Sequence, residues 1–171
     1  NAIAVGVDVD GCGSLIMAKH NKPVFNKTEE ELKELKNATK LPFIVKGLMC
    51  IEDAKKAVNA GADAIVVSNH GGRVLDHTPG TADVLPLIAD ELKGKTTIIV
   101  DGGIRTGYDV LKMLALGADT VLIGRDVIRA AVGGGIDGVQ RIFEHYHKTL
   151  IKAMKQTQCP TLQDISQEIL V

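Results

Sequence analysis

Five short apolar runs recur along the chain, and a segment with the period of an amphipathic helix follows each of them. The runs occupy residues 2–10, 42–45, 64–67, 97–100 and 120–123. The expected helices occupy residues 29–37, 51–59, 81–92 and 107–116, followed by a short helix near 127–132 and a longer one at about 138–154. Strands that alternate with helices in this way are typical of an α/β protein built on a parallel sheet.

The junction between helix and strand is repeated within the chain. Residues 60–67 read AGADAIVV and residues 116–123 read LGADTVLI, with room for two βα units of ordinary length between them. Such repetition is typical of a (β/α)8 barrel, in which eight strands close into a ring. Because fewer strands are expected here, we predict a single domain over residues 1–171, the C-terminal part of a TIM barrel whose N-terminal strands are absent. The first strand begins almost at Asn1, which agrees with a fragment or a processed chain.

The overall composition argues against several classes of protein. The chain has 171 residues and a formal net charge of −1, which gives no reason to expect nucleic acid or an anionic membrane as a partner. No apolar run approaches the roughly 18 residues of a membrane helix, and no leader peptide is recognisable. The three cysteines are scattered and lack metal-ligand spacing, so we expect reduced thiols, a cytoplasmic protein and no metal site.

Polar side chains follow the third expected strand. Ser68, His70 and Arg73 come directly after the apolar run at 64–67, and ligands of parallel α/β folds bind beyond the carboxyl ends of the strands. His70 is a candidate general base because imidazole titrates near neutral pH. Arg73 can bind a carboxylate through two parallel hydrogen bonds. The alternative is a loop with a surface histidine and a solvated arginine.

Neighbouring strand ends also carry charged residues. Lys46 ends the second apolar run, where a lysine needs an anionic or polar ligand unless it turns towards water. Asp101 ends the fourth run and can orient the imidazole of His70, as the carboxylate of a catalytic triad does. Asp8 and Asp10 end the first run, and they either serve the same site or bind nothing.

Two glycine-rich turns follow the fourth and fifth strands. Glycine lets backbone N–H groups approach an anion closely, and the next helix adds the positive end of its dipole. Arginines in the same turns can bind phosphate oxygens, and the last two strands of a barrel commonly form a phosphate site. The turns therefore predict a phosphate-binding site, unless the glycines serve only tight βα connections. The residues concerned are Gly102, Gly103, Arg105, Gly124 and Arg125.

The same residues resemble those of a known family. Lys46, the segment SNHGGR at 68–73, the segment DGGIRTG at 101–107 and the pair GR at 124–125 resemble the FMN-dependent α-hydroxy acid oxidases and dehydrogenases. That family includes glycolate oxidase, lactate oxidase and flavocytochrome lactate dehydrogenase, and the resemblance runs from about residue 41 to residue 169. It implies FMN-dependent oxidation of an α-hydroxy acid to a 2-oxo acid, with this chain as part of a longer enzyme.

The resemblance implies a role for each matching residue. His70 would be the base at the α-carbon or hydroxyl of the substrate, oriented by Asp101, and Arg73 would hold the substrate carboxylate. Lys46 would lie beside the N1–C2 carbonyl edge of the flavin, and Ser68 would contact the flavin or its ribityl chain. The FMN phosphate would be held by the two glycine-rich turns, through Gly102, Gly103, Arg105, Gly124 and Arg125.

Two departures from the family pattern bear on substrate and cofactor. Residues 8–13 read DVDGCG, whereas the family has a threonine-proline-arginine type of sequence whose arginine is a second clamp for the substrate carboxylate. This exchange removes a positive charge and argues against an ordinary lactate-like substrate. The family's N-terminal half, with its active-site tyrosines and most contacts to the isoalloxazine ring, is also missing. We therefore expect the isolated chain to bind FMN weakly and to be inactive.

Two other hypotheses remain open. The first is a related FMN barrel with non-redox chemistry, similar to the isopentenyl diphosphate isomerases, although the spacing of His70 and Arg73 argues against it. The second is a catalytically silent half barrel that pairs with itself or with the missing N-terminal half. An open sheet edge at residues 3–9 would favour such pairing, and we expect a homo-oligomer.

Overall fold

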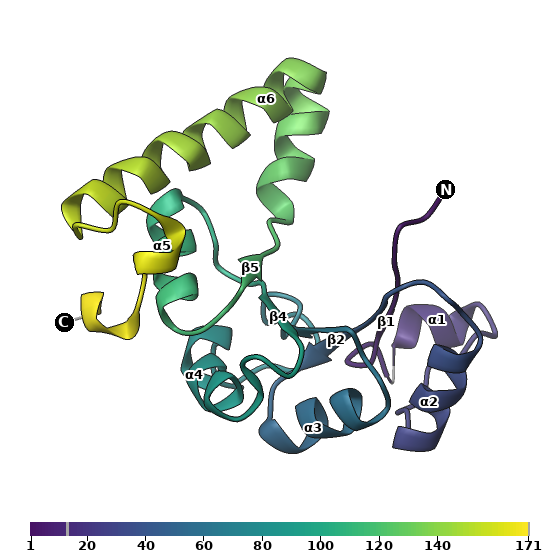
Figure 1. Cartoon of the computed structure of the whole chain (residues 1–171). Coiled ribbons are helices and arrows are strands. Elements are labelled where there is room, and N and C mark those ends of the chain that lie inside the picture. Colours follow the sequence, from purple (N-terminus) through teal and green to yellow (C-terminus); the bar gives the residue numbers. More distant parts are fainter. Residues whose placement is uncertain (13, 171) are drawn as a thin grey trace.

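A parallel β-sheet forms the centre of the molecule. The computed structural model describes residues 1–12 and 14–170. Its sheet has the strand order β1-β2-β3-β4-β5, so that each βα unit lies beside the next along the chain (Figure 1). This confirms the predicted α/β architecture. The strands are β1 (Val5–Asp8), β2 (Phe43–Leu48), β3 (Ala64–Val67), β4 (Thr97–Val100) and β5 (Thr120–Val121).

Most of the helices that follow the strands line one side of the sheet, whereas the last one projects beyond it (Figure 1). The last and longest, α6, is broken at Gly135, whose φ of 56° and ψ of −140° separate two arms. This break accounts for the two helices expected in that region. Two short 3-10 turns, η1 (Leu162–Asp164) and η2 (Gln167–Ile169), end the described chain. The helices are α1 (Leu15–Lys19), α2 (Glu29–Asn37), α3 (Ile51–Asn59), α4 (Thr81–Leu92), α5 (Gly107–Ala115) and α6 (Arg125–Gln156).

The predicted capping box fixes the start of α2. The Thr28 hydroxyl accepts a hydrogen bond from the Glu31 backbone N–H at 3.2 Å, and the Glu31 carboxylate accepts one from the Thr28 N–H at 2.9 Å. The two bonds satisfy backbone donors that the first turn of a helix otherwise leaves unpaired. The capping box also lowers the pKa of Glu31 through the hydrogen bond from Thr28.

The core lies between the sheet and the helices. Successive side chains of a strand point to opposite faces, and one face of the central strands is completely buried. Leu85 and Ile88 of α4 are buried in the same core as these strand residues, and so are Ala54 and Ala57 of α3. The buried strand residues are Val45, Ile65, Val67, Ile98 and Val100. Lys46, next to Val45 in the strand, therefore points to the opposite face.

Strand β2 is longer than expected. It continues to Leu48, so Lys46 lies inside the strand and not at its end as predicted. In the register of the sheet, Lys46 pairs with Asp8 of β1, and a bulge interrupts the pairing with β3 between Lys46 and Leu48. The bulge contains Gly47, which has a φ of +99°. A glycine that reads as a stop signal is here a bulge within the strand. Strand β5 is shorter than expected and ends at Val121.

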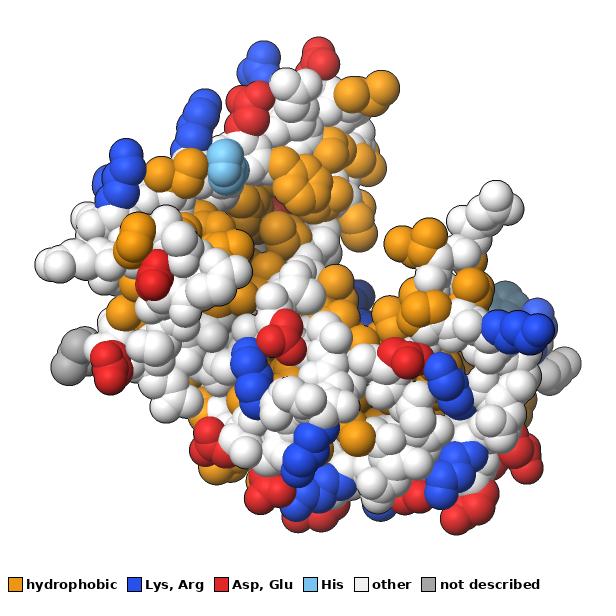
Figure 2. All heavy atoms as spheres, in the orientation of Figure 1, with side chains coloured by type: hydrophobic (Ala, Val, Ile, Leu, Met, Phe, Trp, Pro, Cys, Tyr) orange, Lys and Arg blue, Asp and Glu red, His pale blue; other side chains and the backbone are white. Residues whose placement is uncertain are grey.

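Apolar side chains remain exposed on α6, which follows the last strand, and on the segment before β1. Val132 and Ile136, beside the break in α6, are both 86% exposed, and Ile3 before β1 is 89% exposed. Figure 2 shows such side chains on both sides of the gap between α6 and the N-terminal segment. Within residues 1–12 and 14–170, no helix combines the length and the apolarity needed to cross a membrane.

Candidate active site

Five charged or titratable side chains meet at the carboxyl end of the sheet. Parallel strands bring their carboxyl ends to the same edge, so residues far apart in the sequence become neighbours there. The group combines the ends of β1, β3 and β4 with the interior of β2. We call it the polar cluster, and it consists of Asp8, Asp10, Lys46, His70 and Asp101.

His70 lies in a loop with an unusual backbone. His70, Gly71 and Gly72 have successive φ values of 53°, 68° and 77°, in the left-handed region. For a residue with a side chain this conformation costs roughly 1–2 kcal/mol. The loop is held by the buried Ser68, whose hydroxyl accepts a bond from the His70 N–H at 3.2 Å, and by Asn69, whose carboxamide oxygen accepts one from the Gly72 N–H at 3.1 Å. A strained histidine that is held in this way is common at functional sites.

The environment of Ser68 differs from the role that the resemblance implies. Its side chain is completely buried, and it does not line the neighbouring cavity. Its hydroxyl supports the backbone of His70. In this arrangement Ser68 shapes the loop and has no exposed surface for a cofactor.

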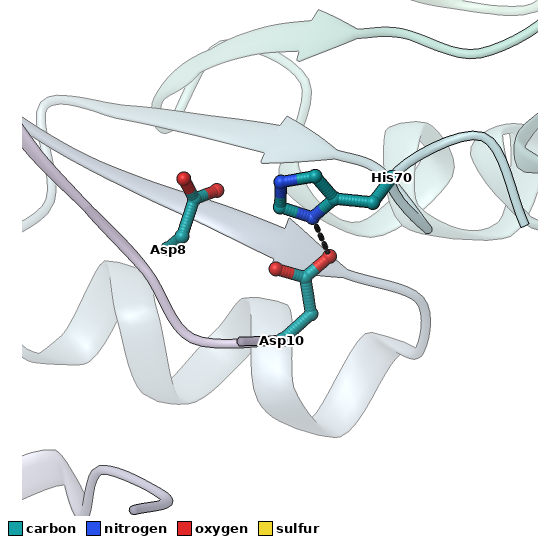
Figure 3. A group of neighbouring side chains, drawn as sticks. All are labelled: Asp8, Asp10 and His70. Atoms are coloured by element: carbon teal, nitrogen blue, oxygen red, sulfur yellow. Dashed lines mark hydrogen bonds and ion pairs between the residues drawn. The ribbon is translucent and has the colours of Figure 1, made fainter. Parts of the chain in front are cut away.

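The imidazole of His70 contacts Asp10 instead of the expected Asp101. Nδ1 lies 2.6 Å from Oδ2 of Asp10, which comes from the turn after β1 (Figure 3). Nε2 lies 3.4 Å from Nζ of Lys46. The prediction that Asp101 orients the ring is therefore wrong for this structure, and the carboxylate on the ring comes from Asp10.

Lys46 links the carboxylates of the polar cluster. Its ammonium group lies 2.9 Å from Oδ1 of Asp8 and 3.7 Å from Oδ2 of Asp101. Among the described residues, two buried oxygens of the cluster have no hydrogen-bond partner, Oδ1 of Asp10 and Oδ1 of Asp101. Three carboxylates thus surround one lysine and one histidine, and the cluster is rich in hydrogen-bond acceptors.

A cavity of about 100 Å³ lies beside the polar cluster, between the β4 and β5 turns. Gly103 has a φ of +72°, and neither at Gly103 nor at Gly124 would an added Cβ meet any atom within 4 Å, so both backbones face open space. Gly124 is the N-cap of α6, and no side chain of the described residues caps that terminus. We call this space the turn cavity. All the predicted site residues except Lys46 and Ser68 line it: His70, Arg73, Asp101, Gly102, Gly103, Arg105, Gly124 and Arg125.

The arginines of the turn cavity are held in different ways. Nε of Arg73 donates to the His70 carbonyl at 2.8 Å, which leaves its terminal NH2 groups for a ligand. Nη1 of Arg105 donates to Oδ1 of Asp126 at 2.7 Å. The guanidinium of Arg125 lies against Gly71, where any Cβ would collide with it. Arg125 therefore connects the β3 loop to the start of α6.

Two further residues of this region were not identified from the sequence. The hydroxyl of Tyr146 lies 2.9 Å from the Ile104 carbonyl and 3.2 Å from Oδ2 of Asp126. Burial and the neighbouring Asp126 carboxylate raise the pKa of Tyr146 to about 12. Asp126 thus joins Arg105 to the second arm of α6. Neither residue belongs to a glycine-rich turn, so no local motif marks them.

Asp8, Asp10 and His70 also offer ligand atoms that lie within 4.8 Å of one another. Such a group can hold a divalent cation in other proteins. Here the ammonium of Lys46 already lies beside Asp8 and His70 and supplies positive charge at that position. The geometry favours an internal ion-pair network over a metal centre.

Comparisons with known proteins point to flavin-dependent enzymes. A family model described as FMN-dependent dehydrogenase matches residues 11–171. A 2-hydroxyacid oxidase of Dictyostelium discoideum is 48% identical over 143 residues, which cover 84% of this chain and 37% of that protein. An L-lactate dehydrogenase of Vibrio parahaemolyticus is 51% identical over 130 residues, which cover 76% of this chain and 34% of that protein.

The fold is also similar to that of solved structures. A crystal structure of mandelate oxidase with 3,3-difluoro-2-hydroxy-3-phenylpropionic acid superposes with a TM-score of 0.87 at 34% sequence identity. The superposition covers 98% of this chain and 54% of that chain. The chain therefore spans about a third of the length of the curated relatives that it matches, and about half of that structure.

Proposed function

The chain belongs to the FMN-dependent dehydrogenase family, and from this premise we propose that it is the C-terminal part of an enzyme that oxidises α-hydroxy acids to 2-oxo acids. The observation that carries the proposal is the single cavity that His70, Arg73 and the two glycine-rich turns line together. This cavity supports the proposal because a candidate base, a candidate carboxylate-binding group and candidate phosphate-binding turns line the same space.

The turn cavity fits the phosphate end of FMN. Gly103 and Gly124 present bare backbone to open space, where a larger residue would occupy the cavity. Arg105 and Arg125 supply positive charge, and the α6 N-terminus adds unpaired N–H groups. Glycine, arginine and a helix N-terminus are the groups that proteins use to bind phosphate. FMN bound in this way supplies the hydride acceptor of the reaction.

His70 is the candidate base. With Nδ1–H donated to Asp10, Nε2 carries the lone pair, which faces the Lys46 ammonium at 3.4 Å in this structure. This lone pair would accept the proton of a substrate hydroxyl that takes the place of the ammonium beside it. Arg73 lines the same cavity, and its terminal NH2 groups can hold the substrate carboxylate in bidentate fashion. The positive charge of Lys46, on the other side of the imidazole, stabilises negative charge that develops at the reacting centre.

The relatives are longer than this chain, and the chain exposes surface that their additional part would cover. Strands β1 and β5 form the edges of the sheet, and apolar side chains are exposed on the elements next to them in the chain, Ile3 before β1 and Val132 and Ile136 in α6 after β5. We propose that the remaining βα units of a longer protein pair with these edges and cover these side chains. The same units would complete the flavin site.

The experiment uses the product of the complete gene, reconstituted with FMN. A panel of 2-hydroxy acids is added without oxygen, and the visible flavin absorption and the 2-oxo acid product are measured. At least one substrate should bleach the flavin and yield its 2-oxo acid in equal amount. A protein that stays colourless after reconstitution, or a flavin-loaded protein that no member of the panel bleaches, would sink the proposal. Admission of air then separates an oxidase, which regains colour quickly, from a dehydrogenase.

A further inference from the structure

A carboxylate lies on the wall of the turn cavity, among its arginines. Asp126 is the second residue of α6 and lines the cavity together with Arg105 and Arg125. Its side chain is only 16% exposed. A carboxylate at this position would repel a phosphate, so the charge of Asp126 by itself does not favour the proposed ligand. Its contacts indicate another role.

Asp126 holds the side chain of Arg105. Oδ1 of Asp126 accepts a hydrogen bond from Nη1 of Arg105 at 2.7 Å, and a bond of this length between charged groups is among the strong ones. It uses one of the five N–H donors of a guanidinium, so other donors remain for a ligand in the cavity. The exposed Arg129 also approaches Oδ1, but only to 3.5 Å. Arg105 is therefore the main partner of this oxygen.

The other oxygen of Asp126 is fixed from behind. Oδ2 accepts a bond from the hydroxyl of Tyr146 at 3.2 Å, and the same hydroxyl lies 2.9 Å from the carbonyl of Ile104, the residue before Arg105. Tyr146 is 5% exposed, and its backbone packs so closely on Gly107 that a Cβ there would collide with it. The carboxylate thus has a fixed position, whereas the side chain of Arg105 is 46% exposed and would otherwise be free to turn into solvent.

The break in α6 makes this arrangement possible. Asp126 and Tyr146 belong to its two arms, and twenty residues of a continuous helix would separate them by about 30 Å. The break at Gly135 instead redirects the second arm towards α5 (Figure 1). A Cβ on Gly138 would collide with the Ala130 carbonyl, so the two arms are in close contact next to the break. The link between Asp126 and Tyr146 is therefore built by the tertiary structure.

We propose that Asp126 is the positioning residue for Arg105 and holds its guanidinium on the wall of the turn cavity, with donors left for a phosphate oxygen. Tyr146 in turn fixes Asp126. This inference rests on the proposed function for the identity of the ligand, but the contacts can be tested without a cofactor. A long side chain that is ordered only on binding weakens affinity by roughly 2- to 10-fold, and Asp126 would remove this cost in advance.

The first test separates the hydrogen bond of Asp126 from its charge. Both Asp126→Asn and Asp126→Ala lose the negative charge, but only Asp126→Asn keeps an oxygen that can accept from Arg105. In the flavin-free product of the complete gene, Asp126→Ala should bind FMN roughly 2- to 10-fold more weakly than Asp126→Asn. The two variants should bind riboflavin, which lacks the phosphate, equally well. Equal FMN affinities, tighter binding to Asp126→Ala, or an equal loss of riboflavin affinity would overturn the proposal.

The second test asks whether Asp126 acts through Arg105. In an Arg105→Gln background, the difference in FMN affinity between Asp126→Asn and Asp126→Ala should disappear. The matched control is Arg129→Gln, which removes the more distant guanidinium and should leave the difference intact. A difference that persists in Arg105→Gln would mean that Asp126 acts through another group, and would contradict the proposal.

Titration of Tyr146 tests the contacts without FMN. Burial and the Asp126 carboxylate raise the pKa of this phenol to about 12, and Arg105 and Asp109 are the other charged groups that act on it. Asp126→Asn and Asp126→Ala should both lower this pKa, while burial keeps it above its ordinary value. The step is identified by its absence in Tyr146→Phe, and an unchanged pKa in both variants would contradict the contact. If the complete protein binds neither FMN nor riboflavin, the proposed function fails, and this titration still decides the contact.

Discussion

The polar cluster and the turn cavity lie at the same edge of the sheet but depend on different parts of their residues. The cluster is held by side chains that reach across β1, β2, β3 and β4 to one another. The cavity is formed by backbone at Gly103 and Gly124, with arginines on its wall. The first arrangement is electrostatic and fails when one charge is lost. The second arrangement depends mainly on the space above the glycine backbone. Several hydrogen-bond donors, from backbone and arginine, would share the binding of a ligand there.

The largest effect on turnover is expected at His70, and it separates the polar cluster from the turn cavity. His70→Asn removes the base but keeps the size and polarity of the side chain. Turnover should fall about 10³-fold or more, within the range that general bases contribute, while FMN still binds to the turn cavity. Stopped-flow measurement of flavin reduction checks the rate, and the flavin-to-protein ratio checks the binding. Retained turnover would show that the polar cluster does not supply the base.

The next effect concerns the support behind the turn cavity. A Cβ on Gly107, the first residue of α5, would collide with the backbone of Tyr146 and Leu150 in α6. Gly107→Ala should therefore destabilise the protein by roughly 1–3 kcal/mol or more, as overpacking does. Urea unfolding measures the change.

The matched control for Gly107 is a glycine in a helix with free space around it. Gly133 lies in the first arm of α6, and a Cβ there would meet no atom within 4 Å. Gly133→Ala should leave stability unchanged or raise it by up to about 1 kcal/mol. Equal destabilisation by the two substitutions would show that the α5–α6 contact does not have the close packing described.

A smaller effect is expected at the cavity wall. Arg125→Gln removes one of the positive charges, while Arg105, the backbone N–H groups and the helix N-terminus remain. FMN affinity should fall roughly 10-fold, which corresponds to about 1.4 kcal/mol. Fluorescence quenching of FMN measures the affinity, and Arg141→Gln, on the exposed surface of α6, is the control. A complete loss of FMN binding in a correctly folded Arg125→Gln variant would mean that the remaining donors do not share the binding of the phosphate.

The smallest effect concerns Tyr146, which joins the cavity wall to α6. Since its pKa is raised to about 12, the folded protein keeps this phenol protonated at pH values where the unfolded chain has lost the proton. The stability from this group is complete below about pH 10 and declines as pH rises towards 12. Spectrophotometric titration should show a late phenolate step that Tyr146→Phe removes. Ionisation of Tyr146 near pH 10 would contradict its burial beside Asp126.

Much of the fold could be predicted because its signals are local. The expected bounds of α2, α3, α4, β3 and β4 agree with the structure. Caps, apolar periods and glycine stops are read within a few residues of where they act. Strand β2 was predicted too short because Gly47, which continues the strand through a bulge, reads as a terminator in a linear sequence.

The candidate site also has parts that local sequence signals predict and parts that depend on three-dimensional packing. The two glycine-rich turns line one cavity, as expected of a shared site, because the topology of the sheet brings together turns that are each contiguous in the sequence. Phosphate binding at this cavity stays a prediction. The partner of His70 was predicted wrongly. The contact with Asp10 depends on the register that pairs Asp8 with Lys46 and on the space above Gly47. Tyr146 and Asp126 were missed because they lie in the two arms of α6 and meet only through the break at Gly135 between them.

The most direct test of the whole account is the primary isotope effect on flavin reduction. The flavin-loaded product of the complete gene is mixed without oxygen with a 2-hydroxy acid substrate that carries either hydrogen or deuterium at C2. If the strand-end site breaks the C2–H bond, as the positions of His70 and Arg73 beside the turn cavity indicate, the deuterated substrate should bleach the flavin several-fold more slowly. Two results would contradict the assignment of this site to α-hydroxy acid oxidation. One is equal bleaching rates for the two substrates when the chemical step limits the rate, and the other is no bleaching by either substrate.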